Sequence, residues 1–147
     1  MTNNLYILLL LGSSLFADET IALITKSIGN AKISSDSKYR LNAEAMTPIF
    51  YGNRIKTKAK SFAQIVYLDD RSTVSIYPKT EVTINGKIEN RMISKHVDVT
   101  AGIVRVKVLK QITNEFKLTT IHSELTCLEC EFWVISNNKV GDQFYKI

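Results

Sequence analysis

Residues 103–110 read Ile-Val-Arg-Val-Lys-Val-Leu-Lys, and they decide the fold class of this 147-residue chain. Val104, Val106 and Val108 alternate with Arg105 and Lys107, so apolar and charged side chains fall on opposite faces of an extended backbone. This period of two is typical of a half-buried β-strand and does not fit the 3.6-residue period of a helix. We therefore expect a strand here, with its valines in the core.

The segments on either side of this strand repeat the pattern. Further apolar or alternating stretches cover residues 21–24, 62–68, 72–78, 81–84, 96–102, 116–121 and 132–136. Residues 39–47 are the one segment that we expect to make a helical turn. Short strands at such regular spacing predict an all-β fold of mostly antiparallel strands, in a two-layer sandwich or a solenoid-like stack.

Two turn signals connect these strands. The pair Asn85-Gly86 lies between the alternating residues 81–84 and the pair Lys87-Ile88, and it predicts a hairpin, because both central positions of such a turn need positive φ. Residues 69–72, Asp-Asp-Arg-Ser, predict a turn between two strands. In the last strand we expect Trp133, beside Phe132, to pack in the core.

The first 17 residues differ from the rest of the chain. A short polar start leads into an apolar run over residues 5–11, followed by small residues and Ala17. This order predicts a signal peptide over residues 1–17, cleaved near Ala17, and a single β domain over residues 18–147. No later segment is apolar for the ~20 residues that a membrane-spanning helix needs. We therefore expect an exported chain, located in the periplasm if the cell has one, without stable membrane insertion.

A basic segment stands out against the mild net charge of +5. Arg54, Lys56, Lys58 and Lys60 alternate with other residues, so on a strand they share one face. They are candidates for a surface that contacts an anionic envelope component or an acidic protein. The other interpretation, which we favour, is a solvated sheet edge protected by lysines against aggregation. The chain shows no nucleic-acid-binding motif.

The two cysteines, Cys127 and Cys130, allow several kinds of site. Haem attachment is excluded because Glu131, and not histidine, follows the second cysteine. A thiol-redox pair needs a low thiol pKa, which neighbouring acidic residues oppose. A zinc site needs two more ligands, for which His122, with His96 or Glu124, is the nearest choice. We favour a disulfide within one turn, and the redox and zinc sites remain alternatives.

Catalytic residues are not evident elsewhere. His122 has no obvious partner as a general base, and Ser123 does not lie in the nucleophile elbow that a serine hydrolase requires. Asp69 and Asp70 are better explained by turn chemistry than by acid–base catalysis. We therefore expect a protein that is not an enzyme and has no cofactor.

Read together, these motifs resemble the FecR domain of bacterial periplasmic regulators. The family's glycine–acid–isoleucine–threonine element is similar to residues 52–57, its turn to residues 69–72 and its glycine-led strand to residues 102–106. Strand positions that match the family's spacing are Ala63, Ile65, Tyr67, Val74, Ile76, Pro78, Thr80, Val82, Ile84, Phe116, Leu118, Thr120, Glu131, Phe132 and Val134. The chain departs from the pattern at Asn53, in place of an acid, and at residues 126–130, in place of a glycine-rich segment.

The resemblance implies a function. A stand-alone FecR-like chain would be a periplasmic, non-enzymatic binding or regulatory module that acts in envelope signalling through protein–protein contact. Its partner would be a protein of the cell envelope, bound through sheet faces or edges by strand addition. The alternative is a binder or carrier of an anionic envelope component such as lipopolysaccharide. A thiol-redox or zinc protein acting through Cys127 and Cys130 is the third.

Overall fold

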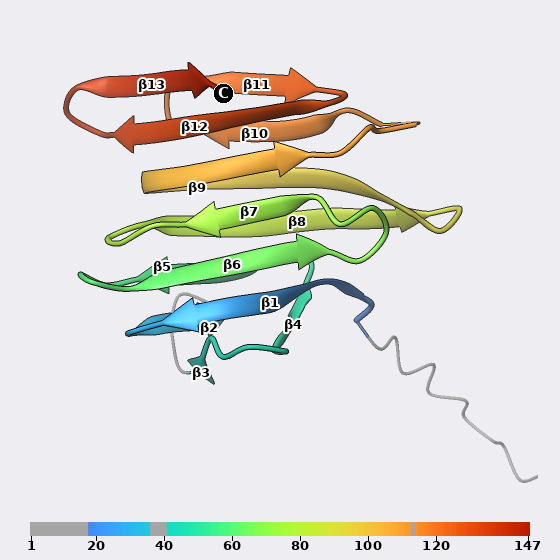
Figure 1. Cartoon of the computed structure of the whole chain (residues 1–147), viewed down its shortest axis with the longest axis horizontal. Helices are drawn as coiled ribbons and strands as arrows, with labels where there is room; N and C mark the ends of the chain where they lie inside the picture. Colours follow the sequence, from blue (N-terminus) through green and yellow to red (C-terminus); the bar gives the residue numbers. More distant parts are fainter. Residues whose placement is uncertain (1–17, 36–40, 113) are drawn as a thin grey trace, which may run out of the picture.

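The computed structural model describes residues 18–35, 41–112 and 114–147, and within them the chain forms β-strands and no helix (Figure 1). The all-β prediction is confirmed. The predicted signal peptide, residues 1–17, lies outside the described residues. The strands of the described part are β1 (Thr20–Ile28), β2 (Ala31–Ser34), β3 (Leu41–Asn42), β4 (Pro48–Phe50), β5 (Asn53–Thr57), β6 (Phe62–Tyr67), β7 (Thr73–Ile76), β8 (Glu81–Glu89), β9 (Met92–Val108), β10 (Phe116–Thr120), β11 (Glu124–Cys127), β12 (Cys130–Asn137) and β13 (Gly141–Lys146).

These strands form a sheet that curls into a half-barrel. Its order is β3-β2-β5-β8-β9-β7-β6-β1-β4, with β10 and β11 added at one half of β9 and β12 and β13 at the other. We call β8, β5, β2 and β3 the back arm and β7, β6, β1 and β4 the front arm, since β8, β5 and β2 lie behind β7, β6 and β1 in Figure 1. The pairs are antiparallel except β9 with β10, which is parallel. The prediction of mostly antiparallel strands is therefore confirmed, whereas a separate two-layer sandwich or solenoid-like stack is not.

The long strand β9 contributes to both arms, because the residues that face the core change from odd to even positions along it. Ile93, Val97 and Val99 are buried in its first half, and Val104 and Val106 in its second. The shift from odd to even positions coincides with a bulge in the pairing with β8, beside Ala101. At Gly102, φ is +108°, in the region that glycine tolerates best. The segments 96–102 and 103–110, expected as separate elements, are therefore one bent strand.

The alternation observed in the sequence describes the core well. The valines expected to face inward from residues 103–110 are buried, and with alternating apolar residues of other strands they form one apolar cluster between the arms. The cluster includes Val74, Ile76, Val82, Ile84, Val97, Val99, Val104, Val106, Val108, Phe116 and Leu118. Burial of such side chains contributes most of the favourable free energy of folding.

The hairpin predicted at Asn85-Gly86 is wrong. Both residues lie inside β8, and the turn to β9 is formed by Asn90 and Arg91, with φ of 51° and 64°. Gly86 has a different role, since a Cβ atom there would lie 2.9 Å from Cγ2 of Ile93. This glycine allows close packing inside a strand, and not a turn.

The helical turn expected at residues 39–47 is also not observed in its described part, residues 41–47. Leu41 and Asn42 form β3, and the following backbone groups bond to neighbouring strands. The Ala43 amide donates to the Ala31 carbonyl at 2.9 Å, and the Met46 amide to the Ile24 carbonyl at 2.7 Å. One local bond, from the Thr47 amide to the Glu44 carbonyl at 3.1 Å, closes a turn here, but Met46 within it has φ of 69°, outside the helical region. By contrast, the turn predicted at residues 69–72 does connect β6 and β7.

Candidate functional site

The predicted basic surface is only partly on a strand. Arg54 and Lys56 are exposed on one face of β5, but Lys58 and Lys60 follow in the turn to β6. Strand β5 lies between β2 and β8, so it is not an edge strand. The interpretation of these lysines as protection for a sheet edge is therefore wrong.

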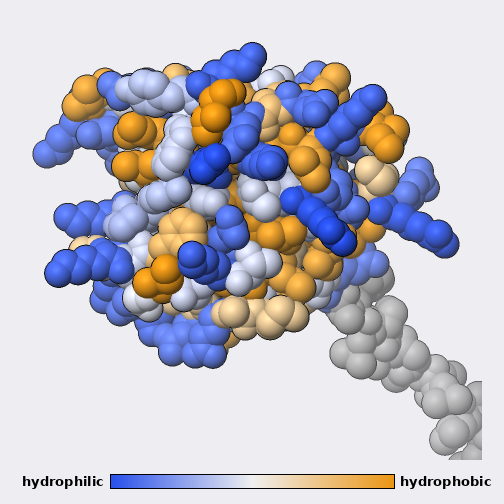
Figure 2. Space-filling view, in the orientation of Figure 1, coloured by the Kyte–Doolittle hydropathy of each residue, from blue (hydrophilic) through white to orange (hydrophobic). Residues whose placement is uncertain are grey.

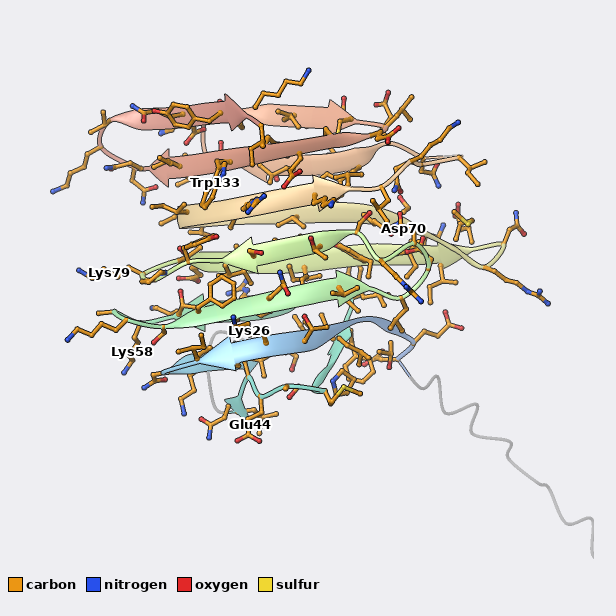
Figure 3. All side chains as sticks on the ribbon, in the orientation of Figure 1. Lys26, Glu44, Lys58, Asp70, Lys79 and Trp133 are labelled. Atoms are coloured by element: carbon orange, nitrogen blue, oxygen red, sulfur yellow. A yellow bond between two sulfur atoms is a disulfide. The ribbon has the colours of Figure 1, made fainter. Side chains whose placement is uncertain are left out.

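A further lysine, Lys79, extends this surface. It lies in the turn between β7 and β8, and Lys58 and Lys79 point away from the same end of the molecule (Figure 3). Both also line one shallow groove together with Lys56 and Ala101. Sequence reasoning missed Lys79 because it follows Pro78 in a turn and belongs to no alternating run.

Trp133 is not a core residue. It lies half-buried on the outer face of β12, while its neighbour Phe132 is buried. Its ring centroid lies 4.8 Å from that of Tyr77, and the Arg105 guanidinium lies 5.6 Å from the Trp133 ring. The alternation of β12 explains this arrangement, because adjacent residues of a strand face opposite sides.

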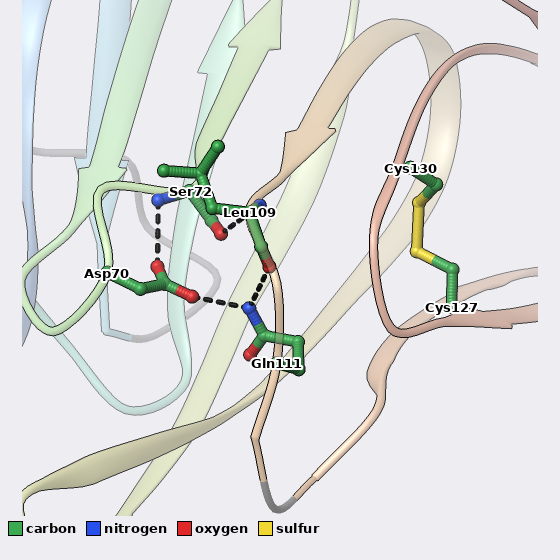
Figure 4. Close-up of a disulfide and its surroundings, with 6 residues drawn as sticks. All are labelled: Asp70, Ser72, Leu109, Gln111, Cys127 and Cys130. Carbon is green, nitrogen blue, oxygen red and sulfur yellow. Dashed lines mark hydrogen bonds between the residues drawn. A yellow bond between two sulfur atoms is a disulfide. The ribbon is translucent and has the colours of Figure 1, made fainter.

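The two cysteines face each other across the turn between β11 and β12 (Figure 4). Their Sγ atoms lie 2.01 Å apart, at disulfide distance, and their Cα atoms lie 6.2 Å apart. Across the described ranges, no three His, Cys, Asp or Glu side chains gather in a way that could hold a metal ion. The backbone amide of Gln111 donates to the Leu128 carbonyl at 2.8 Å, and this bond connects the turn to the segment after β9.

Removing the cysteine pair should have a small effect on stability. We expect the double variant Cys127→Ala/Cys130→Ala to lose about 2 kcal/mol or less, because so short a loop restricts the unfolded chain little. Urea unfolding measures the loss. The wild type in reductant should show a similar change and the variant none. A variant that fails to fold would contradict this prediction.

The most unusual polar feature is a buried ionic cluster formed by Lys95, Asp69, Asp70 and Gln111. Lys95 Nζ lies 2.7 Å from Asp69 Oδ2, 3.0 Å from Asp70 Oδ2 and 3.1 Å from Gln111 Oε1. The Lys95 side chain is 0% exposed and that of Asp69 3%. The cluster joins the turn of the front arm to the first half of β9.

Hydrogen bonds hold Asp70 in its charged form. Burial alone would raise the pKa of this carboxyl, but bonds from the Ser72 amide, Gln111 and Lys95 outweigh burial and hold the pKa below the ordinary 3.8. Gln111 also donates to the Leu109 carbonyl, at 2.6 Å (Figure 4). The turn predicted at residues 69–72 thus anchors the segment that follows β9.

Tyr67 borders the same cluster. Its ring centroid lies 5.5 Å from Lys95 Nζ, and its hydroxyl donates to the Asn85 carbonyl at 3.2 Å. Burial, followed by the charges of Asp69 and Asp70, raises the pKa of this phenol well above its ordinary value. Tyr67 therefore stays neutral.

Lys95 could have been found in the sequence, although we did not single it out. It shares the odd positions of Ile93, Val97 and Val99, so the alternation alone places a lysine on the inward face. A buried lysine needs a counter-charge. Asp69 and Asp70 supply that charge from a turn remote in sequence, and no local pattern indicates their pairing.

Two branches of the sheet end at strands that have a single partner. Among the described strands, β13 pairs with β12 only, and β11 with β10 only. Several apolar side chains near these two strands are exposed, namely Ile121, Leu128, Val140, Phe144, Tyr145 and Ile147. Figure 2 shows apolar side chains among polar ones at this end of the molecule. An exposed edge of this kind can pair with a strand of another chain.

The comparisons with known proteins identify the family. The model of the FecR protein family matches residues 53–143, well over half of the chain. No curated protein matches this sequence. No solved structure matches it either. The match covers β5 to the first half of β13, and so includes the ionic cluster and the cysteine pair. The resemblance found in the strand spacings is confirmed, and the chain belongs to the FecR family.

Proposed function

We propose that this chain is an exported, non-enzymatic module of envelope signalling that binds a protein partner by strand addition at β13. The FecR family is regulatory and non-enzymatic, which supports the general role. Strand addition needs an unpaired edge with free backbone groups and side chains that provide specificity. The free edge of β13 is the observation that carries the proposal.

The hydrogen-bond pattern of β13 defines which groups are free. The Ile147 amide donates to the Glu131 carbonyl of β12 at 3.0 Å. In an antiparallel ladder such bonds alternate, so Tyr145 and Gln143 also point their backbone groups at β12. Asp142, Phe144 and Lys146 then direct their amides and carbonyls to the free edge.

The side chains of β13 suit a protein partner. Phe144 pairs with Val134 across the ladder, so its ring lies on the core side of the sheet, yet it is 37% exposed. Ile147, after the end of the strand, is 57% exposed. A strand added to β13 would cover Phe144 and extend the core beyond the present edge.

The proposed location rests on residues 1–17, which we interpret as a signal peptide cleaved near Ala17. Within the described ranges, no helix has the length and apolar character to cross a membrane. The family is of a periplasmic type, and a disulfide between Cys127 and Cys130 would be stable in an oxidising compartment.

The variant Phe144→Pro tests the proposed edge. Proline removes an amide that points away from β12, so the fold should persist while an added strand loses a hydrogen bond. The matched control Phe144→Val keeps the amide and removes only the ring. Affinity capture from envelope extracts should recover a defined protein with the wild type and, at a reduced level, with Phe144→Val. We expect at least a tenfold lower recovery with Phe144→Pro.

Other outcomes of the capture would count against strand addition. Equal recovery of the same protein by wild type and Phe144→Pro would place the contact elsewhere on the molecule. Recovery of anionic lipid without protein would favour the alternative, a binder of an anionic envelope component acting through Lys56, Lys58 and Lys79. Circular dichroism of each variant confirms that the fold is retained.

A further inference from the structure

The pair Lys95–Asp69 has a feature that a simple ion pair leaves unexplained. Asp69 Oδ2 accepts from Lys95 and, at 2.9 Å, from the Ile93 amide. The other oxygen, Oδ1, is buried without any hydrogen-bond partner. A buried carboxylate oxygen without a partner is costly and rare in folded proteins.

The same pair is arranged for a chemical reaction. A primary amine and a carboxyl group are held in contact at 2.7 Å, inside a site from which water is excluded. Such contact replaces a bimolecular encounter with a reaction inside one fold. Exclusion of water also protects an amide, once formed, from hydrolysis.

We propose that Lys95 and Asp69 condense to an amide, so that the folded chain carries an internal isopeptide cross-link. Lys95 Nζ attacks Cγ of Asp69, the new N–C bond forms, and one C–O bond of the carboxyl group breaks. The ammonium gives up two protons, which leave with the oxygen as one water molecule. The charges of the pair cancel, and the reaction needs no oxidant, reductant or other co-reactant.

Asp70 is the residue that moves the proton. Its Oδ2 lies 3.0 Å from Lys95 Nζ, close enough to take a proton from the ammonium and free the lone pair. It then delivers this proton to the departing oxygen of Asp69, and carries the second proton over the same path once the N–C bond has formed. The Ser72 amide, which donates to Asp70 Oδ1 at 2.8 Å, holds this carboxylate in place.

The hydrogen bonds also select which aspartate reacts. Both oxygens of Asp70 are occupied, by Ser72 and by Gln111 and Lys95. Asp69 has one oxygen bound to the Ile93 amide, where it stays as the amide carbonyl, and one without a partner. Loss of an oxygen from Asp69 therefore breaks the fewest contacts, and it removes the unsatisfied atom.

Intact mass spectrometry of the purified, folded wild-type chain tests the proposal. After correction for the observed N-terminus and the cysteine pair, the mass should be lower than the sequence mass by one water molecule. Proteolysis should then release one branched peptide containing both Lys95 and Asp69. A folded wild type with the full sequence mass and two separate peptides overturns the proposal.

Two variants separate the cross-link from other losses of water. Lys95→Arg keeps a buried cation without a primary amine and should have its full sequence mass. Asp70→Asn keeps the shape but lacks the proton carrier, and it should be cross-linked in a smaller fraction of molecules. Loss of water from Lys95→Arg, or complete loss from Asp70→Asn, contradicts the assigned roles. Because the wild-type mass is decisive alone, a variant that fails to fold does not spoil the test.

Discussion

Replacing Gly102 with alanine is expected to lower the free energy of unfolding by about 3–5 kcal/mol, a large share of a domain's stability. A Cβ atom at this position would lie 2.2 Å from Thr80 Oγ1 and 2.5 Å from Thr80 Cα. The backbone is also at φ +108°, which side chains with a Cβ rarely adopt. Thr80 cannot move aside freely, because its Oγ1 accepts from the Ile103 amide at 2.9 Å.

Gly52 provides a matched control for this variant. It also has positive φ, +78°, but a Cβ there would meet nothing within 4 Å. Gly52→Ala should therefore lose about 1–2 kcal/mol, from the backbone conformation alone. Urea unfolding of both variants measures the difference. Equal losses in the two variants would mean that the contact with Thr80 does not limit the bend of β9.

The second large effect is expected for Lys95→Met, which should lower the free energy of unfolding by about 3–5 kcal/mol because buried acids lose their counter-charge. Methionine fills a similar volume, so lost packing contributes little. The loss is expected whether Lys95 and Asp69 form an ion pair or an amide. Chemical denaturation measures it, with the wild type at the same pH.

Lys117→Met is the control for charge removal. Lys117 Nζ lies 3.1 Å from Glu124, but its side chain is 41% exposed. Water screens such a pair, so this variant should lose about 1 kcal/mol or less. If Lys95→Met were as stable as Lys117→Met, the buried cluster would not contribute to stability.

The cluster also gives a pH dependence. The pKa of Asp70 is lower in the folded chain than its ordinary value of 3.8. The unfolded chain therefore binds a proton more readily, and the contribution of Asp70 is fully present above that ordinary value. It is lost as pH falls through the folded pKa. Asp70→Asn should flatten this acid limb of the stability profile.

How much of the fold could be predicted from the sequence depends on whether each structural feature is determined by neighbouring residues or by distant ones. Alternation at Val104, Val106 and Val108 reports a local geometry, so this strand and its inward face were predicted correctly. The pair Asn85-Gly86 carries a local turn signal. However, Ile93 and Ile21 pack closely against Gly86, and the glycine lies inside a strand, where it leaves room for them. Tertiary packing therefore outweighed turn propensity.

The candidate site residues also divide into those that a local sequence pattern predicts and those that it does not. Cys127 and Cys130 lie close in sequence, and their proximity in space could be predicted. The partners of Lys95 come from a turn 26 residues away, and pairing over that distance leaves no local pattern. The free edge of β13 was also beyond prediction, because whether a strand is central or terminal depends on the order of all the strands.

The bent strand β9 sets the order in which this chain can fold. It pairs with β7, β8, β10 and β12, so neither arm has its central partner until residues 92–108 have been synthesised. Most of these pairings join distant parts of the chain, and proteins with such topology fold slowly. A single cut just before or just after β9 should therefore not release two fragments that fold alone. Both fragments need β9 to complete their sheets, and only one of them would contain it.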